Sequence, residues 1–415
     1  MNASRNDSER GIALILVLVI LPLVAIIMTQ LSFETTIGER LAENVMTNQQ
    51  FKQAIAARRR QVQQRLVRDL KGDEEGGQSE GGAFDHPSDV WGPDSEGGET
   101  ALVVSKGDKD LGDLVTLYTQ IADEQAKFNL NLLRHTDNKR RALAHRRLRV
   151  LLDLFRDSRY GDLIDNEYDL DGAEAQELSE AILKFVKGEE RNEMVGAVEL
   201  PAPAPEMKQG VFTIDDLAFC SPLIVEKRLL ERFTDVNSGQ VIPSLAEFLT
   251  VYGDGRINAN TCPIQVLRAL FTEEEGQMNL AEALFHSRGG FLNTEEDQDL
   301  REERQKERED AAQDGTEEET EESAYRSVND LNKVEGMSNT AYLRREELEV
   351  GRDFTVRSNF YSIVITAQRD NFLRQHRLVL ERHVAGTLTW ESEVRTADSA
   401  NLPEGVSSQS AESSE

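Results

Sequence analysis

An acidic cluster in the first half of the chain has the residue types that bind calcium. The stretch IDNEYDLDGAE carries these carboxylates around one glycine: Asp165, Glu167, Asp169, Asp171 and Glu174. Calcium takes about six to eight oxygen ligands, and carboxylates supply many of them. The spacing is not that of an EF-hand, because counting from Glu167 places Gly172 sixth but Leu178 twelfth, where a glutamate is needed. The cluster is a candidate calcium site, and a solvated acidic loop is the alternative.

The remaining reactive side chains form no recognisable catalytic pattern. The histidines are scattered along the chain: His86, His135, His145, His286, His376 and His383. The chain has no H-E-x-x-H motif, no G-x-S-x-G nucleophile elbow and no phosphate-binding loop. We therefore expect no enzymatic activity. Cys220 and Cys262 are too few for a zinc framework, but they could form a disulfide in an oxidising compartment.

The elements that position these residues begin with an N-terminal apolar run. Residues 12–28 are all uncharged and apolar, and the next charged residue is Glu34. About 20 apolar helical residues cross a hydrocarbon core of roughly 30 Å. A cleaved secretory signal has a shorter apolar core of about 7–15 residues and small residues at its cleavage site, which are missing here. The pattern favours a single-pass anchor, and a slight basic bias favours a cytoplasmic leader.

Apolar residues at helical spacing continue beyond the span as far as Leu70. No proline interrupts the stretch from Leu23 to Leu70, so we expect one helix over residues 12–70, about 90 Å long. A membrane helix joined to a separate coiled coil is the alternative. The helix is expected to end at Lys71, where a Gly- and Glu-rich loop over residues 71–100 begins.

Strand-like runs flank a long helical middle. Residues 101–127 hold two β-patterned runs, and residues 349–395 hold two more, with 390–394 as a further edge. The expected sheet residues are Phe354, Val356, Tyr361, Ile363 and Ile365. Residues 128–348 are mainly helical in pattern and contain a solvated acidic insertion at 294–323, with 15 acidic and 4 basic residues. The predicted class is α+β, with a small antiparallel sheet interrupted by an inserted helical domain and followed by a disordered tail, 396–415.

A faint repeat marks the helical middle. Asn129-Leu130-Asn131 and Asn258-Ala259-Asn260 each precede a helical pattern, and in the second copy Thr261 could cap the helix. Such units resemble SAM-like or helix-hairpin-helix modules, some of which bind the DNA backbone. The net charge of the chain is −29, which would repel nucleic acid, so we expect no nucleic-acid partner.

The N-terminus resembles the type IV prepilin class, which has a short polar leader ending in glycine and an apolar helix directly after it. The resemblance implies that a prepilin peptidase removes residues 1–11 by cutting after Gly11, and that Ile12 becomes a methylated mature N-terminus. Most members carry glutamate at the fifth mature position, where this chain has Leu16. That carboxylate is thought to pair with the N-terminal ammonium of a neighbouring subunit. Leu16 cannot make the pair, which implies a place at a filament tip.

Within that class, the K-type minor pseudopilins of type II secretion (the GspK family) are known for lacking the glutamate. Three further stretches resemble that family: QIADEQAKFNLNLL at 120–133, VYGDGRINANTCPIQVLRAL at 251–270, and a closing pair at 353–368 and 373–384. Ala126 stands where glycine is usual, and Cys262 where alanine is usual. The family binds calcium at an acidic loop, but at 183–199 Phe185 and Lys187 replace the expected tryptophan and aspartate.

The resemblance implies an assembly subunit at the tip of the type II secretion pseudopilus, which helps to initiate the pseudopilus and protein secretion across the outer membrane. The implied partners are the I- and J-type minor pseudopilins, the major pseudopilin, the prepilin peptidase and the inner-membrane assembly platform. The implied location is the bacterial inner membrane, single-pass, with the C-terminal domain in the periplasm. A minor pilin of a type IV pilus and an unprocessed single-pass interaction protein remain as alternatives.

Overall fold

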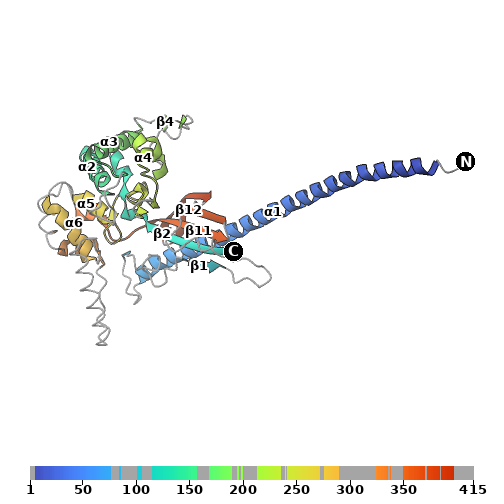
Figure 1. The fold of residues 1–415 in the computed structure, drawn as a ribbon. Coiled ribbons are helices and arrows are strands. Elements are labelled where there is room, and N and C mark those ends of the chain that lie inside the picture. Colours follow the sequence, from blue (N-terminus) through green and yellow to red (C-terminus); the bar gives the residue numbers. More distant parts are fainter. Residues whose placement is uncertain are drawn as a thin grey trace.

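One long helix carries a head at its C-terminal end (Figure 1). The computed structural model describes residues 5–75, 84–85, 101–104, 115–156, 168–188, 194–195, 198–199, 213–234, 239, 241–271, 275–288, 324–334, 337, 349–369, 372–383 and 385–396. Helix α1 spans Arg5–Glu75 and includes Pro22 without a break. It therefore passes the expected end at Lys71, because Lys71, Glu74 and Glu75 are good helix formers and the first Gly-Gly pair comes only at Gly76.

A five-stranded antiparallel sheet packs against the C-terminal half of α1. Its strand order is β1-β2-β11-β12-β13. The strands are β1 (Ala101–Val104), β2 (Val115–Asp123), β11 (Phe360–Arg369), β12 (Phe372–His383) and β13 (Gly386–Thr396). Tyr361, Ile363 and Ile365 lie in β11 as expected, and residues 390–394 belong to the edge strand β13. The chain is thus α+β, with a long apolar N-terminal helix and an antiparallel sheet.

Two of the expected sheet residues lie elsewhere. Phe354 belongs to the two-residue strand β10 (Phe354–Thr355), which pairs in parallel with β9 (Ile257–Asn258), and Val356 lies outside the strands. Both side chains join the hydrophobic core of the helical part rather than the core between α1 and the sheet. The prediction failed because an alternating pattern shows that a residue is buried, but not which core buries it.

The core between α1 and the sheet follows from two different periodicities. Helix α1 contributes residues at helical spacing, and strands β2, β11 and β12 contribute alternate residues of one sheet face. The members are Phe51, Ala54, Ile55, Val62, Leu66, Val115, Leu117, Tyr361, Ile363, Ile365, Ala367, Leu378 and Leu380. Because Leu66, Leu117 and Ile363 are fully buried, this interface fixes the C-terminal half of α1 to the sheet.

A second core organises the helical part, which lies between β2 and β11 in the chain and at the end of the head away from the N-terminus (Figure 1). Its α-helices are α2 (Asn138–Leu154), α3 (Gly172–Lys187), α4 (Pro222–Glu226), α5 (Ile264–Phe271), α6 (Glu275–Ser287) and α9 (Val350–Asp353). Short 3-10 helices span Glu124–Ala126, Leu130–Arg134, Ile214–Phe219, Leu245–Glu247 and Val328–Lys333. Two-residue strands form three more pairs: β3 (Phe128–Asn129) with β8 (Leu249–Thr250), β4 (Met194–Val195) with β5 (Val198–Glu199), and β6 (Phe233–Thr234) with β7 (Val241–Ile242).

The two Asn-x-Asn copies have the same local structure. In each, the first asparagine ends a two-residue parallel strand and accepts a hydrogen bond from the backbone N–H two residues on, at 2.9 Å for Asn129 and 3.0 Å for Asn258. The second asparagine donates its side-chain amide to a distant carbonyl: Asn131 to Val251 and Asn260 to Tyr325. The assignment to a SAM-like or helix-hairpin-helix module stays a prediction.

The packed interface predicts a large difference between two apolar positions of α1. Replacing the fully buried Leu66 by alanine is expected to lower the free energy of unfolding by about 2–5 kcal/mol, because it leaves a cavity. Ile37→Ala, at a position 50% exposed, is expected to change it by less than about 0.5 kcal/mol. Urea unfolding of the detergent-solubilised full chain measures both. Equal effects would show that Leu66 does not lie in a tightly packed core.

Candidate functional site

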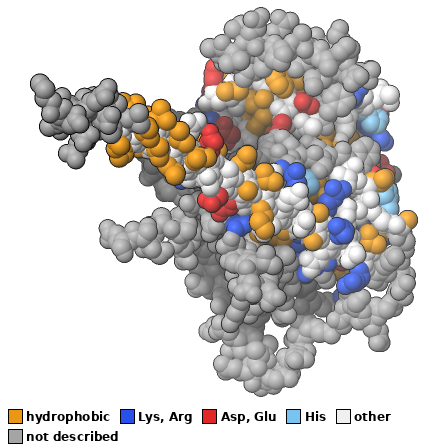
Figure 2. Space-filling model, turned by 90° about the vertical axis from the view of Figure 1, so that its right-hand side faces the viewer, with side chains coloured by type: hydrophobic (Ala, Val, Ile, Leu, Met, Phe, Trp, Pro, Cys, Tyr) orange, Lys and Arg blue, Asp and Glu red, His pale blue; other side chains and the backbone are white. Residues whose placement is uncertain are grey.

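The N-terminal half of α1 is exposed over residues 17–46, and its membrane-length part is apolar. One 18-residue window of this helix has a mean hydropathy of 2.1, is long and apolar enough to cross a membrane, and has none of its residues buried. Its large side chains are exposed on every side of the helix, and Figure 2 shows them as a continuous hydrophobic zone. A core helix of a soluble protein would bury such residues. This part of the chain therefore needs lipid or another apolar surface around it.

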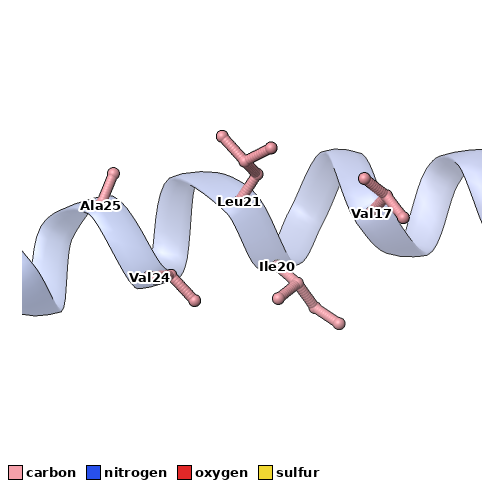
Figure 3. Close-up of a pocket in the computed structure, with 5 residues that line it drawn as sticks. All are labelled: Val17, Ile20, Leu21, Val24 and Ala25. Atoms are coloured by element: carbon pink, nitrogen blue, oxygen red, sulfur yellow. The ribbon is translucent and has the colours of Figure 1, made fainter.

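The shallow hollow on this segment is not a ligand cavity. It is lined by Val17, Ile20, Leu21, Val24 and Ala25, which all belong to α1. Figure 3 shows Leu21 and Ala25 on one side of the helix and Ile20 and Val24 on the other. A small-molecule site needs walls from several directions that enclose the ligand. The apolar helix is therefore a surface for lipid or protein rather than a binding pocket.

The polar residues at the end of the apolar run satisfy their own hydrogen bonds. The hydroxyls of Thr29, Thr35 and Thr36 donate to the carbonyls of the residues four positions earlier, at 2.8, 2.8 and 2.9 Å. A hydroxyl bonded in this way loses little when it leaves water. These three threonines therefore bring no unpaired hydroxyl donor to the point where the helix would leave the membrane.

An apolar stripe continues beyond the membrane-length run. Phe33, Ile37, Leu41 and Val45 follow one another at spacings of four residues and are 67%, 50%, 63% and 56% exposed. Positions 41 and 55 are two heptads apart, so the stripe lies on roughly the face that buries Ile55 against the sheet. A face that is buried in one half of a helix and exposed in the other is suited to a second partner.

Two arginines of the sheet fix the point where α1 leaves the head. Arg369 donates to the side chains of Thr47 and Gln50, at 3.1 and 2.6 Å. Arg374 donates to the side chain of Asn48. Since residues 17–46 are exposed and Thr47 is buried, these contacts coincide with the end of the exposed segment.

A fully buried arginine joins α1 to the sheet near the other end of their contact. Arg382 of β12 donates to Asp69 of α1 at 2.7 Å, to both carboxylate oxygens of Asp85 at 2.7 and 2.8 Å, and to the carbonyl of Ser358 at 2.7 Å. Its guanidinium also lies 5.1 Å from the centre of the Tyr361 ring. A buried guanidinium is stable only when its charge and donors are matched. Two carboxylates from outside the sheet balance the charge and bond both terminal nitrogens, while Nε has no hydrogen-bond partner among the described residues.

A buried carboxylate next to this cluster joins the sheet to the helical part. Asp123, at the end of β2, accepts hydrogen bonds from Thr261 and Ser358 at 2.5 Å each and from Asn258 at 3.0 Å. Thr261, which the sequence suggested as a cap of helix α5, donates its hydroxyl to this carboxylate, and its capping role stays a prediction. Burial raises the pKa of Asp123 to about 6, against the lowering effect of the bonds from Ser358 and Thr261.

The described part of the predicted calcium cluster begins a helix. Asp165 and Glu167 lie outside the described residues. Asp171 accepts from the backbone N–H groups of Ala173 and Glu174 and donates its own N–H to Glu174, so the two form a capping box at the start of α3. Asp169 accepts from the backbone of Leu170. Within the described ranges, no group of three or more His, Cys, Asp or Glu side chains could hold a metal ion. The D-x-x-E spacing carried the capping signal, which the sequence analysis missed.

The two cysteines do not pair. Cys220 and Cys262 are both free thiols, so the predicted disulfide is not formed. Cys262 is fully buried beside Arg288, which donates to the carbonyls of Ala259 and Cys262. Burial raises the pKa of both thiols, that of Cys220 to about 12. A buried thiol with a raised pKa is unreactive, so both residues serve packing.

The predicted processing residues all lie within α1. Gly11, Ile12 and Leu16 belong to the continuous helix that begins at Arg5. They precede Val17, the first residue of the helix whose side-chain exposure is described. The cleavage after Gly11 and the role of Leu16 stay predictions.

One family comparison matches the N-terminal part of the chain. The PilX N-terminal family matches residues 10–54, which cover the apolar run and the exposed stripe. No curated protein sequence matches the chain. The chain is also similar to one in the crystal structure of the GspK-GspI-GspJ complex from the enterotoxigenic Escherichia coli type 2 secretion system. The identity is 12%, the TM-score 0.49, and the match covers 85% of this chain and 100% of that one.

The Arg382 cluster predicts a pH-dependent stability. Burial raises the pKa of Asp69 to about 6 from its ordinary 3.8, with Arg382 opposing and Asp85 adding to the shift, and with Arg357 also opposing. The folded chain thus binds this proton more tightly than the unfolded chain. The resulting stabilisation is complete below the ordinary pKa and is lost as the pH rises through about 6.

Asp69→Asn removes this titration and keeps the shape of the side chain. Between pH 4 and pH 7, the free energy of unfolding of the parent should fall by on the order of 2–3 kcal/mol more than that of the variant. Urea unfolding across this pH range measures the difference. Glu43→Gln, on the exposed half of α1, is the control and should leave the pH profile of the parent unchanged. Identical profiles for parent and Asp69→Asn would rule out the titration of Asp69 in this range.

Proposed function

We propose that the chain is a minor pseudopilin that works at the tip of a type II secretion pseudopilus and helps to initiate its assembly. The observation that carries the proposal is the division of α1 into an exposed apolar half and a half packed on an antiparallel sheet. The match of residues 10–54 to the PilX N-terminal family supports a pilin-type origin of this helix. The motif stretches at 120–133 and 251–270 support the narrower assignment.

The same apolar surface would serve the chain before and after assembly. In the membrane, residues 12–28 would be covered by lipid, with the head on the periplasmic side. In a filament, the apolar helices of neighbouring subunits would replace the lipid, and the stripe of Phe33, Ile37, Leu41 and Val45 would extend this contact beyond the membrane layer. The I- and J-type minor pseudopilins and the major pseudopilin are the partners that fit this surface.

Leu16 and the size of the head both favour the tip. A leucine at the fifth mature position offers no carboxylate to a neighbour's N-terminal ammonium, so the subunit above would lose its ion pair. The tip is the position without such a neighbour. The helical part between β2 and β11 also enlarges the head beyond its helix-and-sheet core, and a bulky head is most easily placed where it has free space on one side.

The buried polar side chains fit a role in holding the head together for assembly rather than a role in catalysis. The buried polar groups around Arg382 and Asp123 are bonded to one another and join α1, the sheet and the helical part. A catalytic site would need a nucleophile and a base that converge on a pocket.

Two other functions make different predictions. A minor pilin of a type IV pilus would be processed in the same way, and the PilX N-terminal match is the observation that favours it. It would be required for pilus formation and dispensable for type II secretion. An unprocessed single-pass interaction protein would keep its leader.

The decisive test is the N-terminal residue of the membrane-embedded protein. With a co-expressed prepilin peptidase, mass spectrometry should find a peptide that begins at an N-methylated Ile12, and without the peptidase the leader should remain. Gly11→Val should block the cut, because a branched side chain then stands at the scissile bond. Gly38→Ala is the matched control, since an added Cβ there meets nothing within 4 Å, and it should be processed normally. A leader retained under all conditions would overturn the pseudopilin assignment.

A further inference from the structure

A buried arginine in the helical part is held by backbone carbonyls. Arg156 follows the end of α2 and is only 1% exposed. Within the described residues, its guanidinium donates five hydrogen bonds, and all five go to carbonyl oxygens. The acceptors are Tyr168 at 3.0 Å, Lys227 at 2.9 Å, Arg228 at 3.1 Å, and Pro243 at 2.9 and 3.0 Å. Loop carbonyls gathered around a cation are a common way to hold a calcium ion, and here the cation is a guanidinium.

These carbonyls belong to separate segments that meet at one end of the head. Tyr168 precedes α3, and Pro243 follows β7. Lys227 and Arg228 follow α4. Figure 1 shows α2, α3 and α4 grouped together there. Carbonyls in loops and beyond a helix end have no partner within a helix, so they need donors from elsewhere. The guanidinium supplies these donors, and its removal would leave several buried carbonyls unpaired.

Arg156 keeps its charge in spite of its burial. Burial lowers the pKa of the guanidinium to about 10, and the carboxylates of Asp169 and Glu247 oppose this shift. At neutral pH the group therefore carries a full positive charge. Its central carbon lies 5.0 Å from the centre of the Phe155 ring and 5.9 Å from that of Phe233. Because Asp169 belongs to the acidic stretch IDNEYDLDGAE, the positive charge acts on that stretch.

A second cation of the chain binds the same acidic stretch. The Lys227 ammonium donates to the backbone carbonyl of Asp169 at 2.9 Å and pairs with the Glu174 carboxylate at 3.3 Å. The carboxylates of Asp169 and Asp171 accept hydrogen bonds from backbone N–H groups that follow them in the chain. Each described carboxylate of the stretch therefore has a partner within the protein. We call Arg156 and Lys227 the internal cations.

These bonds leave a poor set of ligands for calcium. A calcium ion needs about six to eight oxygen ligands that converge on one point. The carbonyls of Tyr168 and Asp169 are bonded to the internal cations, whose charges would repel a divalent ion. At the position that the family resemblance gives for calcium, Phe185 packs against the helical core and Lys187 is exposed, and neither side chain has an oxygen. The described residues therefore fit the internal cations better than a calcium ion.

We propose that Arg156 and Lys227 take the place of a bound metal ion, so that the helical part folds and keeps its stability without calcium. The arginine joins the segments around α2, α3 and α4 by their carbonyls, and the lysine holds the acidic stretch at the start of α3. This role does not depend on the assembly function. It also implies a latent site: without the Arg156 side chain, the same carbonyls would enclose a space that suits the planar donors of a free guanidinium ion.

Thermal unfolding of the detergent-solubilised full chain decides between the internal cations and the calcium site suggested by the sequence. With millimolar calcium chloride and with EGTA, the parent should melt within about 1 °C of the same temperature, because an ion without a site in the folded state does not stabilise it. Lys227→Gln should lower the melting temperature by about 2–5 °C in both conditions. Lys333→Gln removes an exposed lysine that pairs with Asp330 and is the control, with a change of less than about 1 °C. An increase of several degrees with calcium in the parent would overturn the proposal.

Chemical rescue tests the arginine. Arg156→Ala should lower the melting temperature by roughly 5–15 °C, because buried carbonyls lose their donors and a cavity is left. Guanidinium chloride below its denaturing range should then raise the melting temperature of this variant by several degrees, since the ion binds the folded state alone. Calcium chloride and sodium chloride at the same ionic strength should not raise it.

Arg232→Ala is the matched control for the rescue. Arg232 is exposed and pairs with Glu247, so its removal leaves no enclosed space, and guanidinium should not stabilise this variant. If Arg156→Ala does not fold, the yield of refolded protein with guanidinium, calcium or sodium gives the same comparison. Rescue by calcium, or equal effects of guanidinium and sodium on Arg156→Ala, would show that the arginine does not act as the bound cation of this part.

Discussion

The position of helix α1 on the head depends on one buried arginine. Arg382 is removed from water, and such a charge is tolerated only where carboxylates and carbonyls replace its hydration. The replacements come from α1, from Asp85 and from the Ser358 carbonyl, so burying the charge requires all three segments to be in place at once. Asp85 and Asp123 both bind Ser358, which extends this network to the helical part. The two hydrophobic cores are thereby linked by polar bonds.

The division of α1 follows from this arrangement. Arg382 and the apolar residues around Leu66 fix the C-terminal end of the helix. Arg369 and Arg374 fix the point where the helix leaves the sheet toward its N-terminus. On the N-terminal side of Thr47, nothing in the described part of the chain covers residues 17–46 of the helix. A rigid helix held at two points behaves as a lever, so a displacement of its exposed half is transmitted to the head. In the proposed assembly function, the buried network would keep the head aligned with the exposed half of α1.

Local patterns predicted the elements better than the contacts between them. The long helix, strands β2, β11 and β12 and the repeated Asn-x-Asn turns followed from spacing, because each depends on residues close in sequence. The roles of Arg382 and Thr261 could not be read in this way, since their partners lie 313 and 138 residues away. Asp171 and Glu174 carry a helix-capping spacing that was visible in the sequence but not recognised, and the calcium site suggested for their cluster stays a prediction.

Apolar burial and charge have separate roles along α1. Moving an apolar helix from lipid to a bundle of apolar helices changes the burial free energy little, because lipid tails and leucine side chains are similarly apolar. Such a near balance would let a membrane subunit enter a filament, but it would leave the axial position of the helix undefined. Glu34, Glu39 and Glu43 lie in one exposed segment, and Lys52, Arg59 and Arg60 lie in the next. Segregated charges favour one offset and penalise offsets that bring like charges together.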